Sequence, residues 1–419
     1  MKPLGPIPPH FPAQGADLLI AGRPARAWAQ EHGTPLFVYD AAVVRARVAQ
    51  LRSVLPPSVR LHYAVKANPF GPLLALLAGL VDGFDIASAG ELALITAQGI
   101  DPARAGFAGP GKRDGEIGAA IAAGVTLHCE SAREVERALA LGEAVGRRPA
   151  LAIRVNPDFD LRGSGMKMGG GARPFGVDAE QVPLLARRIV ASGADWRGFH
   201  IFAGSQALDA EAVIATQAAT LDLALRLAHE AQVPLPALNL GGGFGIPYFP
   251  GDTPLDLGAV GAALAQRLAD HGAALHGTRL AVELGRYLVG EAGVYLARVV
   301  ERKESRGEVF LVTDGGLHHQ LAASGNFGTV VRRNYPLALA NRMDAPTDEV
   351  ASVVGCLCTP LDRLADRAAL PVGAEGDVVA VFCAGAYGAT ASPAAFLGHG
   401  PAVEILTEIR AENGLPSAG

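Results

Sequence analysis

The sequence predicts an α/β protein in which a closed (β/α)8 barrel is followed by a mostly β domain. Between about residues 36 and 283, short β-branched or aromatic runs alternate with alanine- and leucine-rich stretches of helical period, the pattern of repeated βα units. We count eight such runs, and eight parallel strands indicate a closed barrel. After residue 283 the strand-like runs continue with few convincing helices. The 419 residues also exceed what one ordinary compact core accommodates.

The predicted strands divide the chain into three parts. The eight barrel strands are expected near residues 61–65, 84–87, 105–108, 125–129, 151–155, 198–202, 237–240 and 280–283. Further strands are expected at 293–300, 309–313, 349–354 and 377–382. We therefore predict an N-terminal segment (1–35) that packs with the β domain, the barrel itself (36–283), and the C-terminal β domain (284–419).

Composition and charge argue against several classes of function. The net charge is -5 and the two signs are mixed along the chain, so no basic face for nucleic acid is expected. Charges interrupt every long apolar run, and the proline-rich first ten residues lack the apolar core of a secretion signal. We expect a cytoplasmic protein that does not bind membranes. Four cysteines are too few for a disulfide framework, and the spacing of Cys356 and Cys358 is not that of a zinc knuckle, so no metal site is predicted.

A lysine at the end of the first barrel strand is the first candidate for chemistry. Lys66 ends the run His62-Tyr63-Ala64-Val65-Lys66, with Pro69 three residues later. An amine held in a dry site loses its proton more easily and can then attack a carbonyl carbon. We expect Lys66 to be desolvated in this way and to attach an aldehyde cofactor. The alternative is a surface lysine whose stem lies along the strand end.

Other polar residues occupy equivalent places, because the carboxyl ends of barrel strands converge on one mouth. They are Lys66, Asp85, Arg154, His200 and Glu283. Singly, each could be a satisfied buried polar group, and His200 could simply pack inside the barrel. Five at equivalent positions indicate an active site.

A glycine run after the seventh strand predicts a phosphate site. Without Cβ atoms, Gly241, Gly242 and Gly243 allow backbone N–H groups to approach an anion closely, and barrels commonly bind phosphate after strands seven and eight. Ser205 and Arg286 are expected nearby. An aldehyde cofactor with a phosphate group is pyridoxal 5'-phosphate. The glycine-rich stretch 162–171 is interpreted as either a mobile active-site loop or a plain linker.

Several motifs resemble the pyridoxal-phosphate decarboxylases of the alanine-racemase fold (fold type III), the family of diaminopimelate and ornithine decarboxylases. The resemblance covers nearly the whole chain. It rests on the lysine motif at 64–68, the strand-two motif at 84–88, the glycines at 241–245, the motif Glu283-Leu284-Gly285-Arg286, a cysteine motif at 358–362 and a tyrosine motif at 385–388.

The resemblance implies roles for these residues. Lys66 would hold the cofactor, Arg154 would lie near its phenolic oxygen, and Glu283 would keep its pyridine nitrogen protonated. Gly285, Arg286 and Tyr387 would belong to the phosphate site. Cys358 would return a proton to the substrate carbon, and the cysteine segment would complete the partner's active site in a homodimer. Amino-acid decarboxylation is therefore expected. An amino-acid racemase on the same fold is the alternative, which Glu283 disfavours, and a non-catalytic cofactor carrier of the single-barrel type is a third reading.

Two departures from the family pattern bear on the site and on the substrate. Where the family has a histidine stacked on the cofactor ring, this chain has Phe202, with His200 two residues earlier on the same strand face. Where diaminopimelate and ornithine decarboxylases have an acid that pairs with a distal ammonium, it has Thr359. A neutral hydroxyl would leave a buried cation unpaired.

The substrate's distal end is therefore expected not to be a simple ammonium. The same motifs look closest to a subgroup associated with exosortase gene clusters, with a related branch that acts on carrier-tethered aminoacyl groups. Arg332, Arg333 and Tyr335 lie roughly where the family contacts the substrate carboxylate, with a surface pair of arginines as the alternative.

Overall fold

The structure is a computed structural model that describes residues 1–159, 166–167, 169–325 and 332–407. It divides into two compact units. We call Val48–Pro247 with Asp252–Leu288 the barrel unit, and Met1–Arg47 with Tyr248–Gly251 and Val289–Gly419 the β unit. Each is described by itself.

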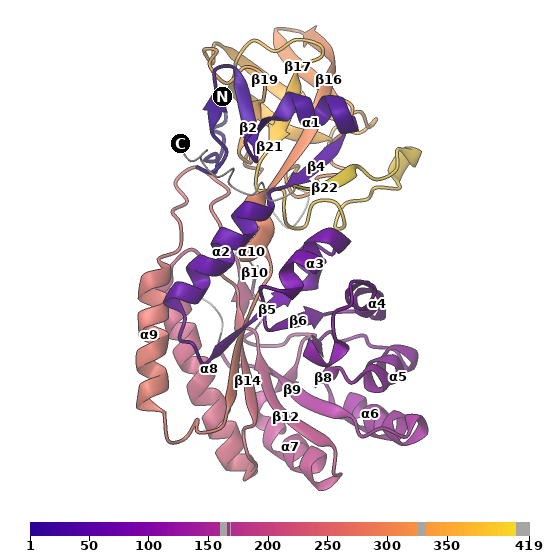
Figure 1. The fold of residues 1–419 in the computed structure, drawn as a ribbon, viewed down its shortest axis with the longest axis vertical. Helices are drawn as coiled ribbons and strands as arrows, with labels where there is room; N and C mark the ends of the chain where they lie inside the picture. The colour runs from indigo at the N-terminus through magenta and orange to yellow at the C-terminus, as the bar shows by residue number, and fades with distance from the viewer. Residues whose placement is uncertain (160–165, 168, 326–331, 408–419) are drawn as a thin grey trace, which may run out of the picture. The chain divides into compact units, whose positions relative to one another are not determined.

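Eight parallel strands form a closed ring in the barrel unit (Figure 1). In chain order they are β5 (Val59–Ala64), β6 (Gly83–Ile86), β7 (Ala105–Phe107), β8 (Thr126–Cys129), β9 (Ala150–Asn156), β12 (Asp195–Ile201), β14 (Ala237–Gly242) and β15 (Arg279–Leu284). β15 pairs with β5, which closes the ring. The predicted barrel and all eight of its predicted strands are confirmed. Short strands accompany the ring: β10 (Met166–Lys167), β11 (Val177–Asp178) and β13 (Gly204–Ser205).

Helices alternate with the barrel strands and surround them (Figure 1). They are α2 (Ala41–Val54), α3 (Gly71–Ala78), α4 (Ala89–Ala97), α5 (Asp114–Ala123), α6 (Ala132–Val145), α7 (Val182–Ala191), α8 (Ala210–Ala231), α9 (Leu257–Asp270) and α10 (Arg286–Val289). Local sequence sets their ends. Ser88 and Ser131 cap α4 and α6 by accepting hydrogen bonds from the third backbone N–H of each helix. Gly124 and Gly146 end α5 and α6 in the left-handed conformation that glycine adopts at little cost.

The β unit is organised around the 13-residue strand β16 (Gly293–Ser305). Its main sheet has the order β18-β21-β16-β17-β19-β20, and β4 pairs with both β16 and β22. The bounds are β4 (Leu36–Tyr39), β17 (Glu308–Thr313), β18 (Leu337–Leu339), β19 (Glu349–Val354), β20 (Arg363–Leu370), β21 (Val378–Val381) and β22 (Val403–Leu406). The four strands predicted beyond residue 283 correspond to β16, β17, β19 and β21. Strand β4 lies inside the range predicted for the barrel but belongs to this sheet.

The N-terminal segment packs within the β unit. It contains β1 (Ala13–Gln14), β2 (Asp17–Ile20), β3 (Arg23–Pro24) and α1 (Ala25–His32). The backbone N–H of Lys2 donates to the carbonyl of Arg367 at 2.8 Å, and that of Leu18 donates to Ala340 at 2.8 Å. The first residues are therefore tied to segments more than 300 positions away.

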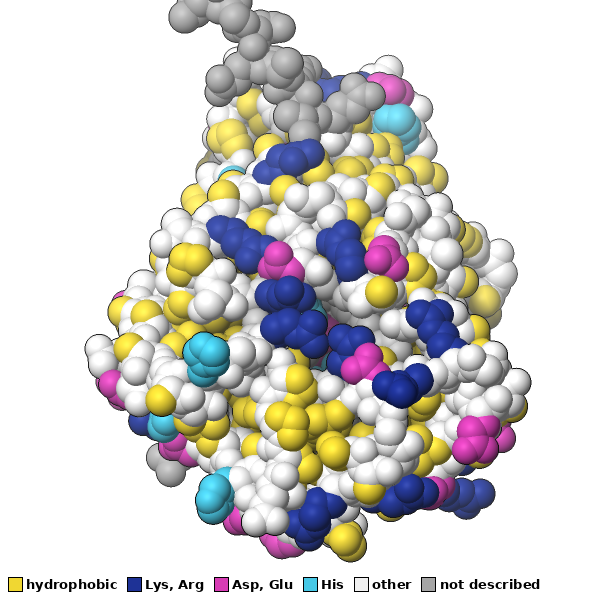
Figure 2. All heavy atoms as spheres, turned by 60° about the horizontal axis from the view of Figure 1, so that its bottom comes forward, with side chains coloured by type: hydrophobic (Ala, Val, Ile, Leu, Met, Phe, Trp, Pro, Cys, Tyr) yellow, Lys and Arg dark blue, Asp and Glu magenta, His cyan; other side chains and the backbone are white. Residues whose placement is uncertain are grey.

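Charged groups of both signs occur together on the surface. Figure 2 shows Lys and Arg side chains gathered on one face, with Asp and Glu among them. At the amino ends of the barrel strands, four arginines line a hollow of about 190 Å³: Arg60, Arg104, Arg197 and Arg279. Arg197 pairs with Asp195, so part of this positive charge is neutralised locally. Within the described residues, no helix is long and apolar enough to cross a membrane.

Candidate active site

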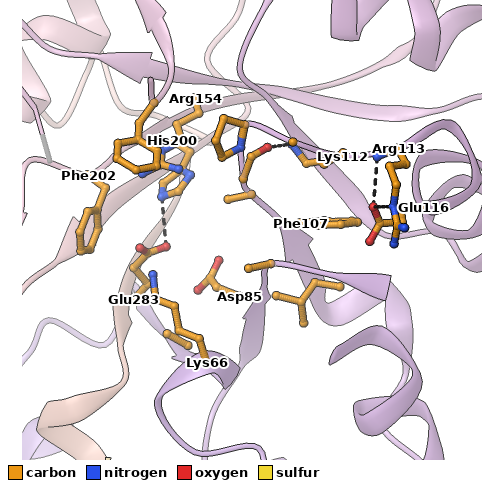
Figure 3. Close-up of a pocket in the computed structure, with 18 residues that line it drawn as sticks. Lys66, Asp85, Phe107, Lys112, Arg113, Glu116, Arg154, His200, Phe202 and Glu283 are labelled. Atoms are coloured by element: carbon orange, nitrogen blue, oxygen red, sulfur yellow. Dashed lines mark hydrogen bonds and ion pairs between the residues drawn. The ribbon is translucent and has the colours of Figure 1, made fainter. Parts of the chain in front are cut away.

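A cavity of about 480 Å³ opens at the carboxyl ends of the barrel strands. Six of the predicted site residues line it: Lys66, Asp85, Arg154, His200, Phe202 and Glu283 (Figure 3). They come from β5, β6, β9, β12 and β15 or from the residues just after them. The expectation that strand ends would bring the five polar groups together is thus met, and Phe202 lines the same cavity.

Lys66 lies in the short 3-10 helix Val65–Ala67, which begins as β5 ends at Ala64. Its Nζ lies 5.7 Å from the centre of the Phe202 ring. The side chain is exposed in the pocket, so the expectation of a lysine desolvated by the chain itself is wrong. The turn directly after β5 carries Lys66 out of the buried strand, whereas Val65 and Ala67 on either side are fully buried.

Glu283, in contrast, is buried, with 6% of its surface exposed. Its Oε2 lies 3.1 Å from Nε2 of His200 and accepts a hydrogen bond from the Asn239 side chain at 3.0 Å. Burial raises the pKa of Glu283, but His200 and the positive charges of Lys66 and Arg154 outweigh burial and hold the pKa well below its usual value. Glu283 is therefore a carboxylate at neutral pH.

Asp85 is the second buried carboxyl group of the pocket. Neither of its oxygens has a hydrogen-bond partner among the described residues, and Nδ1 of His62 lies 3.7 Å from Oδ2. Burial and the negative charge of Glu283 raise the pKa of Asp85 well above its usual value. The pKa values of the two carboxyl groups are thus shifted in opposite directions.

A network of buried ion pairs forms another wall. Arg154 pairs with Glu130 at 2.8 Å, and Lys112 pairs with Glu134 at 2.6 Å. Sequence reasoning missed Lys112 and Glu130, although the rule that found Asp85 applies to Glu130. Lys112 follows β7 by five residues, and Glu130 comes directly after β8. Reading the ends of all eight strands would have found Glu130, whereas Lys112 lies in the loop beyond its strand.

The predicted phosphate glycines lie where β14 approaches its neighbours. A Cβ on Gly242 would lie 1.8 Å from the carbonyl oxygen of Glu283, and Gly241 has a φ of +67°. Larger side chains do not fit at either position. The Gly241 N–H donates to Asn239 Oδ1 at 2.9 Å. Asn239, another residue that sequence reasoning missed, therefore joins this turn to Glu283.

The remaining predicted phosphate residues of the barrel unit follow β12 and β15. Ser205 lies in β13, beside the turn that contains Gly243, whose carbonyl accepts from Ala207 N–H at 2.9 Å. Gly285 permits β15 to pass close to Ala67, since a Cβ there would lie 2.8 Å from that methyl group. Arg286 begins α10. None of these residues lines the cavity that holds Lys66.

The other predicted residues belong to the β unit. Cys358 is exposed, and Thr359 follows it at half-buried depth. Tyr387 has a φ of +57°, a strained conformation of the kind that occurs at ligand sites. Arg332 donates from Nε to the Ser324 carbonyl at 2.9 Å and from Nη2 to the Leu361 carbonyl at 3.1 Å.

Arg333 and Tyr335 contact the same short segment of the β unit. Arg333 lies over the Phe249 ring at 3.7 Å, and Tyr335 stacks near Tyr248 with ring centres 4.6 Å apart. Of the glycine-rich loop 162–171, residues 162–165 and 168 lie outside the described residues.

Comparison with known proteins identifies the fold and the family. Residues 41–290 match the family described as "Pyridoxal-dependent decarboxylase, pyridoxal binding domain". The chain is 35% identical, over 89% of its length and 88% of the relative's, to the L-glutamyl-[BtrI acyl-carrier protein] decarboxylase of Niallia circulans. It is 31% identical to the diaminopimelate decarboxylase of Methanothermobacter thermautotrophicus, over 88% of this chain and 86% of that one.

A solved structure has the same fold. The Helicobacter pylori diaminopimelate decarboxylase complexed with L-lysine superposes with a TM-score of 0.80 at 25% identity, covering 91% of this chain and 94% of that one. Nothing in these matches supports the racemase alternative. The lysine, the ionised glutamate and the glycine turn lie within the matched region. The chain therefore belongs to the pyridoxal-dependent decarboxylase family and is an amino-acid carboxy-lyase that uses pyridoxal phosphate.

Proposed function

We propose that this enzyme decarboxylates an amino acid or aminoacyl group whose distal end is neutral, acidic or tethered to a carrier protein. The observation that carries the substrate class is the chemistry next to Cys358. Thr359 supplies a neutral hydroxyl, and Arg332 places a cation beside the same segment, where its Nη2 donates to the Leu361 carbonyl at 3.1 Å. The carboxylate of the segment, Asp362, is buried and already accepts two backbone N–H groups. A distal ammonium would therefore have no unoccupied acid of residues 358–362 to pair with.

The residues of the barrel unit fit pyridoxal phosphate. The cavity volume lies within the roughly 300–1,000 Å³ usual for cofactor sites, and a lysine amine and an ionised carboxylate both line it. At Gly242 a Cβ would collide with the neighbouring strand, so the turn can present backbone rather than side chains to a phosphate. When bound, the cofactor supplies an aldehyde for amines and a ring that accepts the electrons left by departing carbon dioxide.

Each residue then has a definite task. The Lys66 amine would hold the cofactor through its aldehyde. Glu283 would keep a proton on the pyridine nitrogen by close charge pairing, and Asn239 and His200 orient that carboxylate. Phe202 offers an aromatic face for the ring. Arg154, fixed by Glu130, would serve the phenolic oxygen, and Ser205, Gly285, Arg286 and Tyr387 would assist the phosphate site.

We propose that the enzyme acts as a homodimer in which Cys358 of one protomer donates a proton in the partner's pocket. The exposure of Cys358 supports this assignment. Lys66→Ala and Cys358→Ala should each be inactive alone. Mixing them after mild unfolding and refolding should restore about one quarter of wild-type activity, because half of the dimers are mixed and each has one intact site. Mixtures that stay inactive would contradict shared sites.

The substrate proposal is tested by measuring carbon dioxide release from matched substrates. Glutamate, free and tethered to an acyl-carrier protein, should be compared with lysine, ornithine and diaminopimelate. Wild-type enzyme should prefer the first group, and Thr359→Glu should move the ratio of kcat/KM values toward the diamines by about tenfold, or roughly 1.4 kcal/mol. Thr359→Ser is the matched control. A wild-type preference for diaminopimelate would overturn the substrate proposal, and inversion of the α-carbon without carbon dioxide would favour the racemase alternative.

A further inference from the structure

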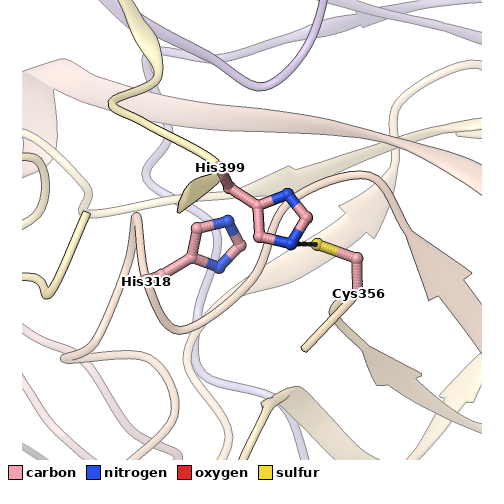
Figure 4. Close-up of side chains that lie close together, drawn as sticks. All are labelled: His318, Cys356 and His399. Atoms are coloured by element: carbon pink, nitrogen blue, oxygen red, sulfur yellow. Dashed lines mark hydrogen bonds between the residues drawn. The ribbon is translucent and has the colours of Figure 1, made fainter. Parts of the chain in front are cut away.

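Two histidines and a cysteine converge in the β unit, from three separate loops (Figure 4). His318 follows β17, Cys356 follows β19, and His399 follows the short turn Phe396–Gly398. One ligand atom from each lies within 4.8 Å of the other two, and Cys356 Sγ is 3.8 Å from Nε2 of His399. None of the three has a role in the proposed decarboxylation.

His318 is the unusual member of this group. It is fully buried, yet neither ring nitrogen has a hydrogen-bond partner among the described residues. Buried polar atoms are nearly always paired, so such an orphaned imidazole requires an explanation. Its ring lies 5.1 Å from the His399 ring, centre to centre. A metal ion between these side chains would satisfy the nitrogen that faces it.

One carboxylate holds the two loops that carry the first two ligands. Asp362, 2% exposed, accepts from the Leu317 N–H at 2.7 Å and from the Leu357 N–H at 2.9 Å. Leu317 precedes His318 and Leu357 follows Cys356, so Asp362 fixes the backbone beside each ligand. A Cβ on Gly316 would lie 2.1 Å from the Asp362 carboxylate, so this close approach requires glycine there. The ligands are thereby preorganised.

The third ligand is positioned by a neighbouring histidine. His319 contacts Tyr295 Oη at 3.1 Å through Nδ1 and the Gly400 carbonyl at 3.0 Å through Nε2. Both of its ring nitrogens are thus used, and it is not itself a candidate ligand. It holds the backbone next to His399 instead, which is the role that second-layer partners have around metal ions.

The donor set selects the kind of metal. Imidazole nitrogen and thiolate sulfur suit zinc, whereas calcium and magnesium require oxygen ligands. Imidazole binds a metal as a neutral ligand, and a bound cation would stabilise the thiolate form of Cys356.

We propose that His318, Cys356 and His399 bind one zinc ion and leave a fourth position for water. Tetrahedral zinc places its nitrogen and sulfur ligands about 3.3–3.6 Å apart, so the 3.8 Å between Cys356 and His399 is already close to that spacing. His399 is exposed and flanked by Gly398 and Gly400, both with φ near +80°, so its loop can complete the approach. Binding releases the thiol proton to solvent. The ion would also order the segment that continues to Cys358.

The test uses the full-length enzyme with pyridoxal phosphate bound. After dialysis against zinc with a competing chelator, metal analysis should find about one zinc per protomer. Cys356→Ser and His399→Ala should each weaken zinc affinity at least about tenfold. Both side chains lie at least partly at the surface, so these variants should fold. X-ray absorption should report one sulfur and two nitrogen ligands.

Cys358→Ser is the matched control, because it removes a thiol two residues away and should keep wild-type zinc affinity. Zinc held by the cofactor or by Cys358 would remain in Cys356→Ser and His399→Ala. Unchanged affinity in those two variants, or no stoichiometric zinc in the wild type, would overturn the proposal. The result does not depend on the substrate or on the role of Cys358, so the proposed function can fail separately.

Discussion

The pocket of the barrel unit and the cluster of His318, Cys356 and His399 in the β unit are built in different ways. In the pocket, each functional side chain stands at or just after the carboxyl end of a strand in a repeating ring. In the cluster, three side chains come from irregular loops, and a single buried carboxylate, Asp362, holds two of those loops. A ring of parallel strands brings residues that are distant in sequence together by its symmetry. Loops, in contrast, need a specific contact to hold each of them beside the next.

The two regions also treat charge differently. In the pocket, His200, Lys66 and Arg154 outweigh burial and lower the pKa of Glu283, whereas burial and Glu283 raise the pKa of Asp85. The cluster has two neutral or exposed imidazoles and a thiol, with no cation among them. A pocket with charged groups of both signs suits an organic cofactor that has several polar atoms. A cluster of nitrogen and sulfur donors without a neighbouring cation suits a metal ion.

The largest expected effect is on Lys66, the residue on which the pocket's chemistry depends most. Lys66→Ala should lower turnover by on the order of 10³-fold or more, because the other lysine that lines the pocket, Lys112, is already paired with Glu134. The visible absorption band of lysine-bound cofactor should disappear, and circular dichroism should stay native. Lys66→Arg is the control, since it keeps the charge but cannot join an aldehyde. A retained band in either variant would mean that another lysine, with Lys112 first in order, attaches the cofactor.

A smaller loss is expected from Glu283→Gln. The amide keeps the shape but removes the negative charge that would hold the pyridine proton, so kcat should fall by on the order of 10²–10³-fold. Glu283→Asp should recover part of the rate, because it restores the charge at a greater distance. The cofactor's absorption spectrum should depend on pH in the amide variant and not in the wild type. Equal rates for the amide and the wild type would remove Glu283 from the mechanism.

The same contrast explains which features the sequence could predict. Each barrel strand has its own apolar run, and a polar residue at the carboxyl end of that run lies at the mouth of the barrel. Lys66, Asp85 and Glu283 could therefore be grouped without a structure. Strand β4 was assigned to the barrel range because Leu36–Tyr39 has the same buried, apolar character as a barrel strand. Only its pairing with β16 places it in the other unit.

Residues that depend on loop closure could not be grouped in this way. His318 and His399 are 81 positions apart, and nothing in their local sequence indicates that they meet. The exposure of Lys66 was also missed, because a sequence shows where a strand ends but not how the next turn directs a side chain. No metal site was predicted at Cys356, because its spacing to Cys358 is not that of a zinc knuckle. That criterion applies only to zinc sites whose ligands come from one short motif.

Asp362→Asn tests whether one carboxylate supports the cluster. The amide nitrogen cannot accept, so one buried N–H, of Leu317 or Leu357, would lose its partner, at a cost of about 1–3 kcal/mol in the free energy of unfolding. Zinc affinity should fall with it. Asp348→Asn, an exposed position in the same unit, is the matched control and should change neither quantity. Wild-type stability and zinc binding in Asp362→Asn would mean that the loops are held by other contacts.

The smallest expected effect is a change in the melting temperature of the cofactor-free protein when Asp85 is replaced. Its sign distinguishes a raised pKa from a lowered one. Burial raises its pKa, so the folded state keeps a proton that the unfolded chain releases above about pH 4. Stability from this group is therefore fully present below pH 4 and declines as the pH rises toward the folded pKa. Asp85→Asn cannot ionise in either state, so it should match the wild type at pH 3 and melt a few degrees higher at pH 7, where each kcal/mol is worth about 2–4 °C.

Asp82→Asn, three residues earlier, provides a control of opposite sign. Burial raises the pKa of Asp82, but the Leu61 N–H and the Arg52 guanidinium outweigh it and leave the pKa below its usual value. Its contribution is present above about pH 4 and lost as the pH falls. Asp82→Asn should therefore lower the melting temperature at pH 7, while Asp85→Asn raises it. If both variants were destabilised at pH 7, Asp85 would be an ionised, paired carboxylate. The raised pKa of Asp85, opposite to the lowered pKa of Glu283, would then be wrong.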